Sequence, residues 1–148
     1  MREIFLTFTL LIFVIIAQAN MTYVSYSKTI SPGDKIFLEY KDVEGEVNVN
    51  GMDACEMLRS YIVGKTTLEV VSSKEESDFI FMLSVIEKNM GYRKGKIDIL
   101  DSKTDKLIFE SKWKKGNSNA AYGWSGTRHA IGRIVKGQIL KEFKEIKK

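Results

Sequence analysis

Residues 112–128 combine cationic and aromatic side chains in a pattern that could bind a ligand. Lysines flank Trp113, and a loop of small polar residues then carries two further aromatics on either side of a glycine. Aromatic faces can pack against sugars or peptides, and Lys and Arg side chains can bind anions. The predicted binding residues are therefore Tyr122, Trp124, Lys112, Lys114, Lys115 and Arg128.

The two loop aromatics also have a structural interpretation. Tyr122 and Trp124 come just before a predicted helix. Apolar side chains in that position can fold back over the end of the core as a staple ahead of the helix. Both interpretations stay open on the sequence.

The sequence offers little for catalysis. The single histidine, His129, has no second histidine or cysteine cluster beside it, so no metal or other cofactor is predicted. The glycines at 91 and 95 lack the strand-to-helix context of a phosphate loop, and no G-x-S-x-G elbow is present. We expect a non-enzymatic binding domain. The alternative is a small secreted hydrolase or carbohydrate-active enzyme using His129 and the 116–126 loop.

Cys55 is the only cysteine, so the chain cannot be held by internal disulfides. It lies in a helical pattern, where Asp53 and Glu56 disfavour a thiolate and Arg59 favours one. The sequence predicts a buried structural thiol rather than a reactive one.

Hydrophobic periodicity predicts the elements that position these residues. Five segments have the pattern of strands: 35–41, 66–72, 77–88, 94–100 and 107–113. In the last of these, Leu107, Phe109 and Trp113 should share one face. A helix is predicted over 53–64, capped by Asn50 or Asp53.

A second, longer helix should begin at Ser125 or Thr127 and run to about residue 146. Its apolar stripe consists of Ile131, Val135, Ile139, Phe143 and Ile146. Two internal glycines, Gly132 and Gly137, predict a close approach of this helix to the sheet.

The order β-α-β-β-β-β-α predicts an α+β fold. The simplest arrangement has two layers, a five-stranded mixed sheet with both helices on one face. Residues 35–148 should form this single domain, and the polar residues 20–34 a flexible N-terminal arm.

Residues 1–19 have the pattern of a cleavable signal peptide. Arg2 precedes an apolar stretch at 4–16, and Ala17-Gln18-Ala19 predicts cleavage before Asn20. The apolar stretch is shorter than the roughly 20 residues of a membrane-spanning helix. The residue directly after Ala19 is Asn20 and not a cysteine that could carry a lipid anchor. We therefore expect a periplasmic or secreted protein.

The charge is divided between the two halves of the chain. Residues 20–78 contain six Lys or Arg and eleven Asp or Glu, whereas residues 79–148 contain sixteen and seven. A basic half suits an envelope protein or an anionic envelope polymer as partner, and export argues against nucleic acid. Alternatively, the lysines keep the domain soluble and protect its strand edges.

Residues 77–143 resemble a pattern of small periplasmic α+β domains. The matching pieces are Ser77-Asp78-Phe79, the turn Leu100-Asp101-Ser102-Lys103-Thr104-Asp105-Lys106, residues 109–113 and residues 128–134. The resemblance is to the N-terminal domain of the Tol-system periplasmic protein and to curli-secretion-type envelope domains. Asp105 stands where those families usually have glycine. The resemblance implies a non-catalytic envelope domain that binds proteins or polymers.

Overall fold

The computed structural model describes residues 28–88, 91–118 and 125–148. The predicted signal peptide and the loop aromatics Tyr122 and Trp124 lie outside these residues, as does most of the predicted N-terminal arm.

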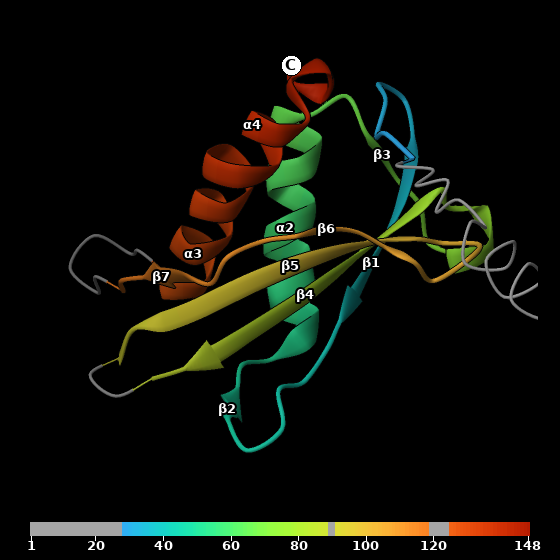
Figure 1. Cartoon of the computed structure of the whole chain (residues 1–148). Coiled ribbons are helices and arrows are strands. Elements are labelled where there is room, and N and C mark those ends of the chain that lie inside the picture. Colours follow the sequence, from blue (N-terminus) through green and yellow to red (C-terminus); the bar gives the residue numbers. More distant parts are fainter. Residues whose placement is uncertain (1–27, 89–90, 119–124) are drawn as a thin grey trace, which may run out of the picture.

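Seven strands form one mixed sheet (Figure 1). They are β1 (Lys35–Tyr40), β2 (Val47–Asn48), β3 (Glu69–Val70), β4 (Phe79–Glu87), β5 (Arg93–Asp101), β6 (Leu107–Glu110) and β7 (Lys114–Gly116). The main order is β3-β1-β4-β5-β6, while β2 pairs with β4 and β7 with β5. β1 runs parallel to β3 and β4, and the other pairs are antiparallel.

The helices cover one face of this sheet, which confirms the predicted α+β class (Figure 1). Helix α2 (Gly51–Lys65) lies beside a C-terminal helical segment made of α3 (Gly126–Ile134), the π-helical turn η4 (Val135–Ile139) and α4 (Leu140–Glu142). Single 3-10 turns, η1 (Lys74–Glu76) and η5 (Lys144–Ile146), complete the described elements. None of the helices in these parts of the chain is long and apolar enough to cross a membrane.

The core lies between the sheet and the helices. Alternate residues of the two central strands point into it, and they are Phe79, Phe81, Leu83 and Val85 of β4 with Ile97 and Ile99 of β5. The C-terminal stripe is confirmed, since Ile131, Val135, Ile139 and Ile146 are buried. Both helices begin at a polar cap, because side-chain oxygens of Asn50 and Ser125 accept backbone N–H groups.

The sheet has seven strands where five were predicted, because the short strands β2 and β7 pair with β4 and β5. Two packing details also differ from the prediction. Leu107 and Trp113 are exposed, because the ladder between β5 and β6 shifts register at Ile99/Leu100 and β6 ends at Glu110. Gly132 does not approach the sheet. A Cβ there would lie 2.5 Å from the hydroxyl oxygen of Tyr61, so this glycine lets the C-terminal helix approach α2.

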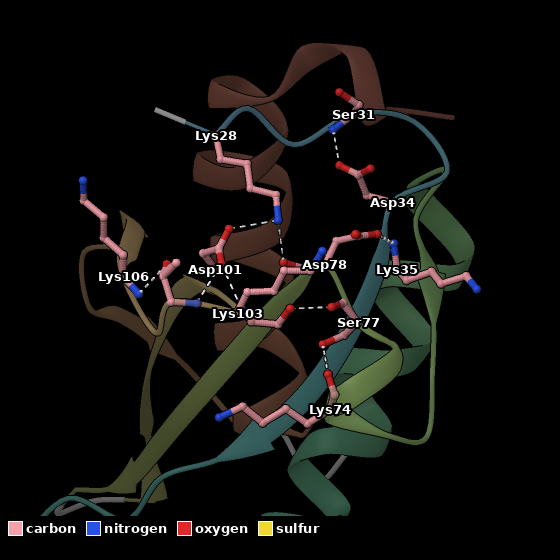
Figure 2. Close-up of polar contacts among 12 residues, drawn as sticks. Lys28, Ser31, Asp34, Lys35, Lys74, Ser77, Asp78, Asp101, Lys103 and Lys106 are labelled. Carbon is pink, nitrogen blue, oxygen red and sulfur yellow. Dashed lines mark hydrogen bonds and ion pairs between the residues drawn. The ribbon is translucent and has the colours of Figure 1, made fainter. Parts of the chain in front are cut away.

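The last part of the predicted arm is held against the domain. Ile30 is buried in the core. Lys28 Nζ lies 2.9 Å from Asp101 Oδ2 and donates a 3.0 Å hydrogen bond to Asp78 O (Figure 2). It also lies 4.4 Å from the centre of the Phe79 ring. Residues 28–34 therefore pack with the domain rather than extend from it.

Candidate functional site

The described cationic residues of the predicted site lie in β7, just before it, and at the start of α3. Gly116 makes this region tight, because a Cβ at Gly116 would lie 1.9 Å from Gly126 O. Arg133 Nη1 donates a 2.9 Å hydrogen bond to Lys115 O. The Gln138 amide accepts from Lys112 N–H at 2.8 Å and donates to Lys112 O at 2.9 Å. The helical segment therefore fixes the backbone from Lys112 to Gly116.

The structure separates the four predicted cations instead of gathering them. Side chains alternate along a strand, so Lys114 shares the helix-facing side of β7 with Gly116. Lys115 points to the other side, where its Nζ lies 4.1 Å from the centre of the Tyr92 ring. Lys112 and Arg128 are exposed, and neither lines the groove that receives Lys114.

Lys114 opens onto a groove of about 490 Å³ between α2, β7 and the C-terminal helical segment. The groove continues along a second hollow at the end of α2 that shares Lys136 and Lys141 with it. We call the two together the basic groove. Its charged lining residues are all Lys or Arg, namely Lys65, Lys114, Arg133, Lys136, Lys141, Lys147 and Lys148.

Tyr61 provides an aromatic wall in the basic groove. Its ring is half-buried against the core and packs close to the backbone of Gly132. Lys136 Nζ lies 5.7 Å from the centre of the same ring, so the ring holds one of the groove cations by a cation–π contact. The groove therefore combines several cationic groups with an aromatic surface.

His129 also lines the basic groove, and one of its ring nitrogens accepts a backbone hydrogen bond. Asn117 N–H donates to His129 Nδ1 at 3.3 Å. The backbone therefore occupies the lone pair of Nδ1. Among the described residues lining the groove there is no carboxylate, and no group of three His, Cys, Asp or Glu elsewhere in the described parts could hold a metal ion.

The π-helical turn explains why a regular helical pattern does not place Lys141 in this groove. Leu140 N–H donates to Val135 O, five residues back, instead of the usual four. The turn therefore holds one more residue than an α-turn and shifts every later side chain around the axis. Lys141 consequently shares a face with Arg133 and Lys136. In a regular helix, Leu140 would take that place instead.

Comparisons with known proteins give no family assignment. No family model matches the chain, and neither does any curated protein. Among solved structures, the C-terminal domain of LpoB from Salmonella enterica matches with a TM-score of 0.46 and 10% identity, covering 62% of this chain and 87% of that one. The PelC dodecamer from Paraburkholderia phytofirmans matches with a TM-score of 0.45 and 12% identity, covering 72% and 88%. Neither is a Tol-system or curli-secretion-type domain by name, so that resemblance stays a prediction.

Proposed function

We propose that this chain is an exported, non-enzymatic envelope domain that binds an anionic envelope polymer in the basic groove. The observation that carries the proposal is the groove lining. Seven Lys or Arg side chains line the groove, and none of its described lining residues is a carboxylate. A concave surface lined by charges of one sign concentrates counterions of the other sign. The predicted signal peptide supports a location where such polymers occur.

The shape of the groove favours a chain-like ligand. Its cations extend from Lys114 on β7 to Lys148 at the C-terminus, so successive acidic groups of a polymer can each meet a cation. The long side chains lose conformational freedom on binding, and each exposed ion pair contributes at most about 1 kcal/mol. Affinity must therefore come from several contacts, and it should fall steeply as salt is added.

The histidine geometry supports binding over hydrolysis. A general base needs a free lone pair on the nitrogen that faces the substrate. In His129, the Nδ1 lone pair already accepts the Asn117 N–H, so this nitrogen is not the free base that hydrolysis would need. No observation in the groove favours the enzymatic alternative, in which His129 would act as a base.

The experiment is a titration of the chain, as recovered from an expressing bacterium, with a fluorescein-labelled polyuronate. Dextran of the same length serves as the uncharged control. The double variant Lys136→Glu/Lys141→Glu should weaken binding at least tenfold. The matched control Lys103→Glu/Lys106→Glu makes the same change in net charge on exposed lysines of the β5–β6 turn and should alter binding less than twofold.

Three outcomes would contradict the proposal. Equal losses in the two double variants would mean that net charge, and not the groove, attracts the polymer. Equal binding of dextran would exclude a charge-based site. Capture of an acidic protein with no binding of polyuronate would assign the groove to a protein partner instead.

A further inference from the structure

On one side of β1, some backbone N–H and C=O groups form no hydrogen bonds with a described strand. Lys41 N–H donates to Leu83 O at 2.9 Å, and Lys35 O accepts from Asp78 N–H at 2.8 Å, so odd-numbered residues of this segment face β4. Even-numbered residues face the other side, where Ile36 O accepts from Val71 N–H at 3.0 Å. Leu38 and Tyr40 therefore direct their N–H and C=O groups toward the outer side of the sheet.

The neighbouring strand on that side is too short to cover them. β3 pairs with β1 only at Lys35 and Ile36. Within the described parts of the chain, no strand lies beside Leu38 and Tyr40 on the outer side. A free edge of this kind can add an extended peptide as a further strand. Figure 1 shows β1 continuing past the end of β3.

An apolar groove of about 590 Å³ runs beside the free edge, between β1 and the start of α2. Leu38 and Tyr40 form one side, while Met52 and Cys55 form the other. Met52 is 82% exposed, so a large apolar side chain stands uncovered at the groove. Tyr40 is fixed, because its hydroxyl donates to Val85 O at 2.7 Å and its ring packs against Gly51.

One carboxylate lines this groove, and two more lie near it. Asp42 is one of its lining residues, and Glu39 and Glu56 lie close enough to Cys55 to help raise the pKa of its thiol, an increase caused mainly by burial. Arg59 acts in the opposite direction on the thiol, but its side chain is paired with Glu56 at 3.3 Å. Glu39 alternates with Leu38 and Tyr40 along the strand, so it projects on the opposite face of the sheet.

We propose that the β1 edge at Leu38–Tyr40 binds an extended segment of a partner protein in which apolar and cationic residues alternate. The added strand forms hydrogen bonds with the backbone groups of Leu38 and Tyr40. Its apolar side chains point into the groove against Met52, and its cationic side chains lie over Glu39. The site is distinct from the basic groove and takes a ligand of opposite charge.

The probe is a capped peptide of six alternating valines and lysines, added to the chain as recovered from the expressing bacterium. Hydrogen exchange followed by NMR should slow at least tenfold for the amides of Leu38 and Tyr40. Alkylation of Cys55, the only thiol, should slow at least fivefold at saturating peptide. A peptide of the same sequence with every backbone N–H methylated should give neither effect, since it has no N–H group to donate to the strand.

Matched variants test the groove itself. Met52→Lys should weaken peptide binding at least tenfold, whereas Val63→Lys should change it less than twofold. Val63 is an exposed apolar residue on the same helix, 51% accessible and outside the groove, so the two variants add the same charge. Lys136→Glu/Lys141→Glu should leave peptide binding unchanged, which separates failure of this proposal from failure of the polymer proposal.

Each contrary result overturns the proposal. Unchanged exchange at Leu38 and Tyr40 with millimolar peptide would show that the edge does not accept a strand. Equal effects of the N-methylated peptide would mean that the peptide binds through the apolar groove and not by pairing with the strand. Protection that rises with protein concentration in the absence of peptide would assign the edge to a second copy of this chain.

Discussion

Replacing Asp101 by Asn should isolate the charge of the carboxylate that holds the chain ahead of β1. Asp101 Oδ1 accepts from Lys103 N–H at 2.9 Å and from Thr104 N–H at 3.0 Å, and its other oxygen pairs with Lys28 (Figure 2). An asparagine oxygen can keep both backbone hydrogen bonds. The variant therefore loses the ion pair while the turn keeps its side-chain support.

The size of the effect follows from the pKa of Asp101. The hydrogen bond from Lys28, followed by those from the backbone N–H groups, lowers it from 3.8 to about 2 despite the opposing effect of burial. At about 1.36 kcal/mol per pKa unit, the full shift corresponds to about 2.4 kcal/mol. Lys28 is 36% exposed, so water screens part of this. We expect Asp101→Asn to lower the free energy of unfolding by about 1–2 kcal/mol at pH 7.

The pH dependence has a definite sign. Because the folded-state pKa is depressed, the contribution of Asp101 is complete above the unfolded pKa of about 4 and disappears as pH falls toward about 2. Urea denaturation at pH 7 should therefore show a midpoint lower by about 0.5–1 M for the variant. Near pH 2 the two midpoints should nearly coincide.

Asp105→Asn is the matched control in the same turn. Its carboxylate makes an exposed ion pair with Lys74 at 3.1 Å, and asparagine tolerates the left-handed backbone of this position, where φ is 52°. The control should shift stability by less than about 0.5 kcal/mol. Equal stability of Asp101→Asn and the parent chain at pH 7, or a difference that persists unchanged at pH 2, would refute the reasoning.

Three further predictions need only standard measurements. Gly116→Ala should lower the free energy of unfolding by more than about 3 kcal/mol in urea denaturation, because its Cβ would strike the backbone oxygen of Gly126; a loss below about 1 kcal/mol would contradict this contact. Gly64→Ala should raise that free energy by about 0.5–1 kcal/mol, since the site is helical and no atom lies within 4 Å; a decrease would be inconsistent with the open position. Mass spectrometry of the chain recovered from an expressing bacterium should show Asn20 at the N-terminus, and an intact Met1 would exclude the predicted cleavage.

The main elements could be predicted because their signals are local. The continuous apolar pattern of β4 and the alternation of β5 follow directly from which of their faces meet the core. The apolar stripe predicted the buried face of the C-terminal helical segment. The polar caps at Asn50 and Ser125 predicted where the two helices begin. These features depend on residues close in sequence.

Features that depend on tertiary pairing were harder to predict. β7 contains two lysines and a glycine, which no strand propensity favours, and it forms because β5 extends beyond β6 and offers it a ladder. Asp105 occupies a left-handed position, which glycine adopts most easily and which no local strand or helix signal predicts.

The candidate site was predicted only in part. The cluster of cations around β7 indicated an anion-binding region, and Lys114 lies in it. Its other members come from α2, from α3, from the π-helical turn and from the chain beyond it, and no sequence spacing relates Tyr61 to Lys141. The prediction for Tyr122 and Trp124 concerns residues outside the described structure and stays open.

Helix α2 links the two proposed binding surfaces and sets the distance between them. Met52 and Cys55 near its start line the apolar groove, whereas Lys65 at its end lines the basic groove. At 1.5 Å per residue, Met52 and Lys65 are about 20 Å apart along the helix axis. This exceeds the Debye length of about 8 Å at physiological ionic strength. Charge changes in the basic groove should therefore barely reach the β1 edge, so a cationic peptide and an anionic polymer can bind together and independently.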